Sequence, residues 1–207
     1  MLSAETDDRA ERRRLRRIHE ARFPRQKTLA EFDTASPSID QQTIALLASC
    51  SYLDKGEPIV LLGDSGTGKS HLLIGLGQAA CEKGRSVRYV TCAQLVNELA
   101  EIADERRLSR LVARYGRLDL LAIDELGYVR LDARGGELLF QMLTEREEKS
   151  SVAVATNLPF SEWGQVVTDP RLVAAIVDRL TFRAHILETG TESYRLRSSR
   201  RARTKST

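Results

Sequence analysis

From residue 57 onward, the chain alternates short apolar runs with longer amphipathic segments. The short runs have the length and composition of strands, and the longer ones repeat apolar residues at helical spacing. The predicted strands cover residues 58–62, 86–91, 118–123, 152–156 and 184–188. The predicted helices cover residues 69–82, 93–103, 105–115, 134–148 and 171–180. This alternation is typical of a parallel sheet covered by helices, so we predict a three-layer α/β sandwich with a five-stranded parallel sheet.

The residues before this region form a separate segment rich in arginine. Residues 9–23 place a few apolar side chains at helical spacing among arginines, which predicts a basic helix with a narrow apolar stripe. Pro24 is expected to end this helix, and a second helix is predicted to begin near Ile39. At the other end, the sequence SSRRARTKST has the composition of a disordered segment.

Charge is unevenly distributed along the chain. Residues 1–27 hold nine Lys and Arg against five Asp and Glu, a net charge of +4, and residues 194–207 hold six against none. Residues 28–193 hold seventeen against twenty-four, a net charge of −7. We therefore divide the chain into a basic N-terminal helix, an acidic body and a basic tail. Basic ends either contact a polyanion or are solvated without a partner, and charge alone does not decide between these roles.

Length and composition restrict the class of protein. The 207 residues fit one domain with short extensions, and 42% hydrophobic residues suffice for a core. No apolar run is long enough to cross a bilayer and the first residues lack a secretory signal, so we expect a cytoplasmic protein without membrane contact. The three cysteines, Cys50, Cys81 and Cys92, lack the number and spacing of a disulfide framework or a zinc site.

The clearest chemical motif follows the first predicted strand. It is a complete phosphate-binding loop, formed by Gly63, Asp64, Ser65, Gly66, Thr67, Gly68, Lys69 and Ser70. The glycines let the backbone curl so that successive amides point at a triphosphate, and the following helix adds its dipole. In this motif Lys69 neutralises the β and γ phosphates, and Ser70 supplies a hydroxyl ligand to Mg²⁺. We therefore predict a site for ATP and Mg²⁺.

A second motif is the apolar segment 118–123 followed by Asp124 and Glu125. A buried parallel strand would carry Asp124 to the carboxyl edge of the sheet, where it could hold Mg²⁺. Glu125 is then placed to orient or deprotonate the water that attacks the γ phosphate. Such a pair can also merely cap the next segment, but the nearby phosphate-binding loop favours catalysis.

Two single residues complete the predicted catalytic set. Asn157 follows the strand 152–156, so its amide could contact the γ phosphate or the attacking water, although asparagine before Leu-Pro is also a common turn former. Arg179, near the end of a predicted helix, could reach the ATP of a neighbouring subunit and stabilise charge in the transition state. Its alternative role is an ordinary salt bridge, and Arg183 is the reserve candidate.

The predicted helix 105–115 carries a row of arginines. They are Arg106, Arg107, Arg110 and Arg114, of which the last three share one face. This face could follow the backbone of double-stranded DNA, or it could be a solvated surface balanced by nearby acids. The aromatic residues form no stacking array, so base-specific recognition is not predicted.

Several segments together resemble one family. The similarity to the IstB-like helper ATPases of bacterial insertion sequences rests on GDSGTGKSHLLIGLG, LLAIDELGYVRLDARGGELLFQML, ATNLPFSEWGQVVTDPRLVAAIVDRL and GTESYRLR. These helpers belong with the DnaC-like helicase loaders to the AAA+ ATPases. The resemblance covers residues 28–197, and the NLPFSEWG and ESYRL segments are much more specific to the family than the phosphate-binding loop.

The resemblance implies an ATPase that assembles as a homo-oligomer on double-stranded DNA, bends it and presents it to a transposase. On this mapping Gly63 to Ser70 form the first Walker element, and Asp124 with Glu125 form the second. Asn157 matches the first sensor, and Arg179 matches the arginine finger that completes a neighbour's site.

The resemblance also carries expectations about the rest of the chain. It assigns the DNA contact to the helices around residues 106–114 and implies no helical lid after the last strand. Family members usually have a longer N-terminal helical region, of which residues 1–27 would be the last helix.

Three other functions stay open. A helicase loader shares every ATPase motif. A small-molecule kinase can also carry a phosphate-binding loop, but it would need an acceptor pocket and a lid of mobile arginines, and the sequence indicates neither. The third is an ATP-binding module that does not assemble.

Overall fold

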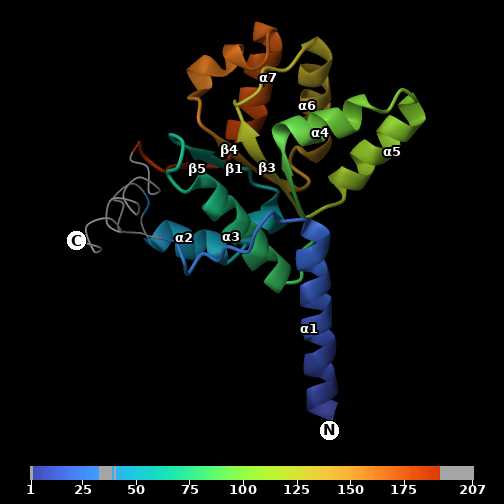
Figure 1. The fold of residues 1–207 in the computed structure, drawn as a ribbon, viewed down its shortest axis with the longest axis vertical. Coiled ribbons are helices and arrows are strands. Elements are labelled where there is room, and N and C mark those ends of the chain that lie inside the picture. Colours follow the sequence, from blue (N-terminus) through green and yellow to red (C-terminus); the bar gives the residue numbers. More distant parts are fainter. Residues whose placement is uncertain (1, 33–38, 40, 192–207) are drawn as a thin grey trace, which may run out of the picture.

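The chain forms a five-stranded parallel sheet between two layers of helices (Figure 1). The structure, a computed structural model, describes residues 2–32, 39 and 41–191. The strands are β1 (Ile59–Leu62), β2 (Val87–Thr91), β3 (Leu120–Leu126), β4 (Ser151–Thr156) and β5 (His185–Glu188). Their order in the sheet is β2-β3-β4-β1-β5, and every neighbouring pair is parallel. The predicted three-layer α/β sandwich with a five-stranded parallel sheet is confirmed.

Helices cover both faces of the sheet. One face is covered by α3 (Lys69–Glu82), against which α1 (Leu2–Ala21) and α2 (Gln41–Ala48) pack. The other face is covered by α4 (Cys92–Ala100), α5 (Glu105–Gly116), α6 (Ala133–Arg146) and α7 (Pro170–Thr181). Two short 3-10 helices, η1 (Ser51–Lys55) and η2 (Phe160–Gln165), complete the described elements. Helix α1 extends well away from the sheet (Figure 1).

The strands bury both of their faces. Along β1, Ile59 and Leu61 belong to the core under α3, whereas Val60 belongs to the core under α4 to α7. All three side chains are fully buried. Because successive side chains of a strand point to opposite faces, a continuously apolar run fits a central strand of a covered sheet. This is why the short apolar runs of the sequence locate the strands.

Side-chain caps set the starts of several helices. Thr91 and Gln94 form a reciprocal capping box at α4. The carboxylates of Asp104, Asp132 and Asp169 accept backbone hydrogen bonds at the first turns of α5, α6 and α7. These caps place each helix start within two residues of its predicted position.

Some predicted boundaries are wrong. The third strand is β3, which begins two residues later than predicted and continues through Asp124 and Glu125 to Leu126. Asp119 does not enter the strand, because its carboxylate accepts hydrogen bonds from the backbone N–H and the hydroxyl of Ser86. A register shift between Ile123 and Leu126 against β4 lengthens the strand beyond the apolar run.

The basic helix also differs from its predicted extent. Helix α1 begins near the start of the chain and ends at Ala21, before Pro24, because Arg22 adopts a left-handed conformation with φ of 57°. The second helix begins at Gln41 rather than near Ile39. The predicted disordered tail, residues 194–207, lies outside the described residues, as does the segment on which the predicted absence of a lid depends. No helix in the described part of the chain is long and apolar enough to cross a membrane.

Candidate functional site

The phosphate-binding loop joins β1 to α3 at the carboxyl edge of the sheet. Gly63, Gly66 and Gly68 have φ values of 149°, 84° and 102°, which residues with side chains rarely adopt. A Cβ atom on Gly63 would lie 2.9 Å from the carbonyl oxygen of Gly190, which follows β5. The loop therefore needs glycine both for its curl and for its close approach to the segment after β5.

Lys69 lies inside the curl of this loop. Its side chain is nearly buried, and its Nζ donates hydrogen bonds of 2.6 and 2.7 Å to the carbonyl oxygens of Gly63 and Asp64. Burial lowers the pKa of Lys69, and the charges of Asp124 and Asp64 only partly offset that effect. Two carbonyl oxygens at the start of the loop accept hydrogen bonds from the ammonium group. The oxygens of a bound anion could replace them as its hydrogen-bond partners.

Asp124 is a buried carboxylate on β3, with 4% of its surface exposed. Its Oδ2 accepts a 2.5 Å hydrogen bond from the hydroxyl of Tyr89 on β2, and its Oδ1 accepts one of 2.8 Å from the backbone N–H of Glu125. Burial and this carboxylate both raise the pKa of Tyr89, so the phenol stays protonated and remains a donor. The position of the Asp124 carboxylate is therefore fixed from two sides.

Glu125 is the exposed residue in an otherwise buried strand. Its φ of 59° is unusual for a residue with a side chain, and it lies at the register shift between β3 and β4. Glu125, Asp124 and Ser70 line one cleft with a volume of about 670 Å³. The structure thus brings the start of α3 and the two acids of β3 together, as the two motifs predict. Local strain at such a position is common at functional sites.

Asn157 lies at the end of β4, the strand adjacent to β3. The pairing of Leu126 with Thr156 brings Asn157 close to the loop that follows the two acids. Its Oδ1 is buried without a hydrogen-bond partner in the described part of the chain, and a Cβ on Gly127 would lie 3.0 Å from it. Asn157 does not line the cleft with Asp124, so its predicted contact with the γ phosphate stays a prediction.

Arg179 lies at the opposite edge of the sheet from the phosphate-binding loop. It lines a small cavity with Pro58, which precedes β1, whereas the loop follows β1. Its Nε is 3.2 Å from the Oε2 of Glu147, and its guanidinium stacks 4.4 Å from the ring centre of Phe140. Arg183 lines the same cavity, with its guanidinium 5.2 Å from the ring centre of Phe182. Neither arginine is placed to serve the loop of its own chain.

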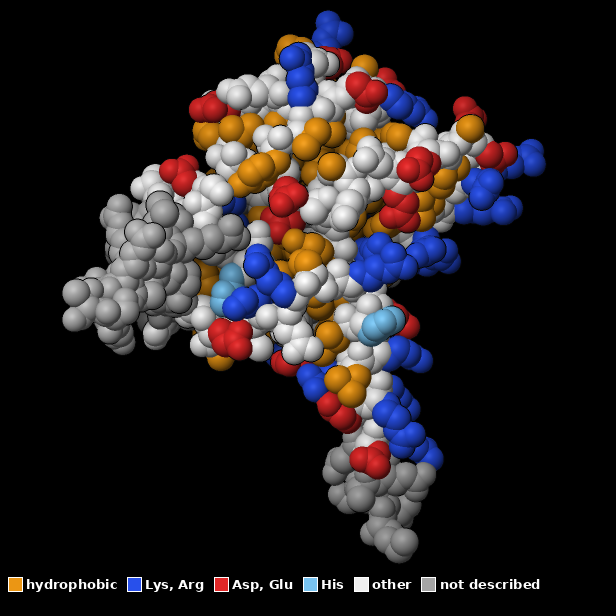
Figure 2. Space-filling view, in the orientation of Figure 1, with side chains coloured by type: hydrophobic (Ala, Val, Ile, Leu, Met, Phe, Trp, Pro, Cys, Tyr) orange, Lys and Arg blue, Asp and Glu red, His pale blue; other side chains and the backbone are white. Residues whose placement is uncertain are grey.

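The four arginines predicted to contact DNA lie on α5, and all four are exposed: Arg106, Arg107, Arg110 and Arg114. None of them forms an ion pair with another described residue. The apolar face of the helix packs through Leu108 and Val112 against the core, which leaves the basic face to the solvent (Figure 2). Whether this face binds DNA stays a prediction.

Several residues that contact the loop were not predicted from the sequence. The hydroxyls of Thr67 and Thr189 are 2.5 Å apart, and Thr189 also donates to the carbonyl oxygen of Leu62. The hydroxyl of Tyr128, after β3, donates a 3.2 Å hydrogen bond to that of Ser65. These partners are far from the loop in sequence, and neither the loop motif nor the Asp124–Glu125 pair includes them, so only the parallel order of the strands could have suggested these contacts.

Another such group lies at the start of α3. A Cβ on Gly68 would be 2.7 Å from the ring of Phe32. The rings of Phe32 and His71 pack edge to face, with their centres 5.5 Å apart. The Nε2 of His71 is 2.8 Å from the carbonyl oxygen of Thr28. Residues 28–32 are thereby attached to the loop.

Solved structures with the same architecture include those of helicase loaders and replication initiators. The chain superposes on DnaI with a TM-score of 0.66, 17% identity and coverage of 79% of this chain and 90% of DnaI. For AMPPCP-bound DnaA from Aquifex aeolicus the TM-score is 0.69, with 19% identity and coverage of 88% and 56%. For the DnaC helicase loader it is 0.58, with 19% identity and coverage of 71% and 86%. The chain therefore shares the AAA+-type P-loop fold of these proteins.

Sequence comparison gives the family. The family of IstB-like ATP binding proteins matches residues 1–202. The ATP-binding protein of insertion sequence IS5376 from Geobacillus stearothermophilus is 36% identical over 97% of this chain and 80% of its own length. The ATP-binding protein of insertion sequence IS21 from Pseudomonas aeruginosa is 35% identical over 97% and 76%. The chain belongs to the IstB-like ATP-binding proteins of insertion sequences, as its motifs predict.

Proposed function

We propose that this protein is an oligomeric, DNA-binding ATPase that assists and regulates the transposase of a bacterial insertion sequence. In this proposal, binding and hydrolysis of MgATP switch the assembly on and off. The main observation in support of ATPase activity is the cleft at the carboxyl edge of the sheet. Ser70 at the start of α3 lines this cleft together with Asp124 and Glu125 of β3. The names of the relatives support the link to ATP and to insertion sequences.

The residues of the cleft fit a magnesium ion. Ser70 offers a hydroxyl and Asp124 a fixed, buried carboxylate, and such hard oxygen donors suit Mg²⁺. No group of three or more His, Cys, Asp and Glu in the described residues could hold a metal by itself. That agrees with an ion held by one or two protein ligands together with phosphates. When bound, Mg²⁺ would neutralise charge on the β and γ phosphates.

The side chains around the cleft then have distinct roles. Lys69 exchanges its two carbonyl partners for phosphate oxygens, and the backbone N–H groups at the start of α3 donate to the same phosphates. Glu125, exposed in the cleft, orients a water and accepts its proton. Asn157 brings its side-chain amide, whose buried Oδ1 has no partner in the described residues, to the neighbouring strand end. Its Oδ1 accepts a hydrogen bond from the attacking water, or its amide nitrogen donates one to the γ phosphate.

The position of Arg179, at the opposite edge of the sheet from the loop of its own chain, supports assembly. A guanidinium at the amino edge of the sheet can complete the site of a second copy, where it would stabilise the charge of the transition state. Each ATP would then be contacted by two subunits, so ATP favours the assembled state and hydrolysis weakens it. Glu147 and Phe140 hold Arg179 until that contact forms.

The link to DNA and transposase has separate support. The exposed arginines of α5 suit the phosphate backbone of double-stranded DNA. The transposase is proposed as a partner because relatives of this chain are named as proteins of insertion sequences.

Release of phosphate from ATP, measured with and without duplex DNA, tests the proposal. We expect Mg²⁺-dependent release that rises when DNA is added, and no ATP binding by the Lys69→Ala variant. ATP binding without phosphate release under either condition would reduce the protein to an ATP-binding module. Transfer of the phosphate to a small metabolite without free phosphate would make it a kinase and overturn the proposal.

A further inference from the structure

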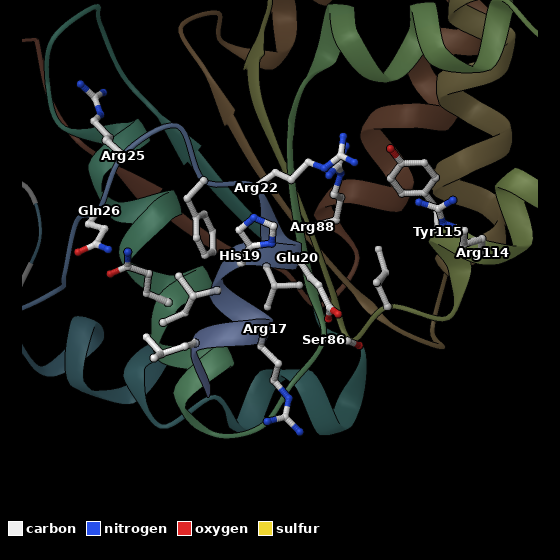
Figure 3. Close-up of a pocket in the computed structure, with 16 residues that line it drawn as sticks. Arg17, His19, Glu20, Arg22, Arg25, Gln26, Ser86, Arg88, Arg114 and Tyr115 are labelled. Carbon is white, nitrogen blue, oxygen red and sulfur yellow. The ribbon is translucent and has the colours of Figure 1, made fainter. Parts of the chain in front are cut away.

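A large groove lies beside the sheet, between α1, the edge strand β2 and α5 (Figure 3). Its volume is about 990 Å³. The walls are apolar where Leu15, Ile18 and Phe23 meet Val87 and Leu118. It borders the cleft that contains Asp124 and Glu125, but neither acid lines it.

Arginines from α1, from the segment that follows it, from β2 and from α5 line the groove. They are Arg17, Arg22, Arg25, Arg88 and Arg114. None of the five forms an ion pair within the described part of the chain. The acidic residue that lines the groove, Glu20, lies 3.7 Å from Arg16 on the outer side of α1. The groove is therefore strongly positive although residues 28–193 are acidic overall.

The positive surface extends beyond the groove in two directions. Along α1, exposed arginines continue away from the sheet, and on α5 the arginines predicted to contact DNA continue from Arg114 (Figure 2). Helix α1 has 20 residues and is therefore about 30 Å long, close to the length of one turn of B-form DNA. Arg22 and Arg88 extend toward the side of the groove where Arg114 and Tyr115 lie (Figure 3).

We propose that this groove binds the phosphate backbone of duplex DNA through Arg22, Arg88 and Arg114. The proposal rests on the proposed DNA binding and gives it a surface that includes β2 and the segment after α1 as well as α5. Guanidinium groups that come from three segments and lie on the same side of the groove suit phosphates, because the fork of an arginine donates two hydrogen bonds to one phosphate group (Figure 3). A run of arginines on one helix can be merely solvated, whereas this grouping depends on the tertiary structure.

The groove also connects DNA with the nucleotide site. Arg22, Arg25 and Arg88 line both the groove and the cleft that contains Asp124 and Glu125. A DNA phosphate bound by Arg88 would therefore lie next to the strand whose Tyr89 holds Asp124. This arrangement gives a direct route by which DNA can affect ATP hydrolysis.

The test compares two triple variants of the full chain. The groove variant carries Arg22→Asn, Arg88→Gln and Arg114→Gln; asparagine is chosen at position 22 because it tolerates the left-handed backbone there. The control variant removes the same charge from exposed positions outside the groove, with Arg134→Gln, Lys149→Gln and Arg171→Gln. Binding to a labelled duplex is measured at saturating ATP and several salt concentrations, and a cooperative thermal unfolding transition shows that each variant is folded.

We expect the groove variant to bind duplex DNA about ten- to 100-fold more weakly, with a log–log salt slope less steep by about three. The control variant should bind as the unaltered protein does. If the groove variant is folded but keeps the DNA affinity and salt slope of the control, the groove proposal is wrong while DNA binding stands, and an acidic protein surface becomes the occupant to test. If the unaltered protein does not bind DNA, both proposals fail.

Discussion

The hydroxyl of Tyr89 donates a 2.5 Å hydrogen bond to the Oδ2 of Asp124, which lies 35 residues further along the chain on the neighbouring strand. Tyr89 itself is nearly buried, and its ring packs edge-on against Phe23, just after α1, with the ring centres 6.2 Å apart. The carboxylate proposed to hold Mg²⁺ is thus linked through one tyrosine to the segment that follows α1.

The variant Tyr89→Phe removes this hydrogen bond and keeps the aromatic ring. We expect this variant to need an about tenfold higher Mg²⁺ concentration for half-maximal hydrolysis, because a hydrogen bond that orients a metal ligand typically contributes that much to metal affinity. Phosphate release measured against Mg²⁺ concentration would show the shift. The matched control is Tyr52→Phe, since the hydroxyl of Tyr52 is buried without a partner in the described residues. Identical Mg²⁺ curves for the two variants would rule out a positioning role for Tyr89.

The exposed carboxylate of Glu125 leads to a second prediction. Glu125→Gln keeps the size and hydrogen-bonding capacity of the side chain but cannot accept a proton from water. ATP binding should change little, and hydrolysis should fall by at least about 100-fold. Calorimetry with ATP and single-turnover phosphate release measure the two effects separately. Normal hydrolysis by this variant would show that another group acts as the base.

The position of Arg179 predicts complementation between inactive subunits. Arg179→Ala should leave ATP binding by the separate subunit unchanged, because the guanidinium lies at the opposite edge of the sheet from the loop. In the assembled protein, we expect its loss to reduce hydrolysis by about 1,000-fold. Mixing Arg179→Ala subunits with Lys69→Ala subunits should restore part of the activity. Two inactive variants that stay inactive when mixed would contradict action between subunits.

The environment of His71 predicts a pH dependence of stability. Burial lowers the pKa of His71 in the folded chain below its ordinary value, even though the hydrogen bond with the carbonyl of Thr28 opposes this shift. The unfolded chain therefore binds the proton more tightly, so this contribution to stability is complete above about pH 6.5 and decreases as the pH falls below it.

Urea unfolding between about pH 5 and pH 7.5 measures the effect of His71. In His71→Gln the side chain can still donate to Thr28 but cannot titrate in this range, so the free energy of unfolding should decrease less toward acid than in the unaltered protein. Parallel pH profiles for the two proteins would show that His71 contributes nothing to the acid sensitivity.

Local sequence patterns were sufficient for much of the site. The loop from Gly63 to Ser70 is contiguous and its geometry depends on its own glycines, so its position between a strand and a helix could be predicted. Asp124 and Glu125 follow an apolar run, which was enough to place them at the carboxyl edge of the sheet. The run did not show that β3 continues past them, because the extension depends on pairing with β4.

Other features depend on residues that are distant in sequence. Neither Tyr89 nor Thr189 belongs to a motif, and each acts on the site only because parallel strands end side by side. Arg22, Arg88 and Arg114 are far apart in the sequence and share no motif. They line one groove because α1 packs against β2.

The sequence by itself determined the alternation of strands and helices, the phosphate-binding loop and the family, because these depend on short-range periodicity and on contiguous motifs. Only the tertiary structure decided which side chains hold Asp124, which edge of the sheet carries Arg179, and that arginines from three separate elements share one groove. The physical reason is that such contacts are set by the order of strands in the sheet and by the packing of helices on its faces, which bring together residues that no local pattern relates.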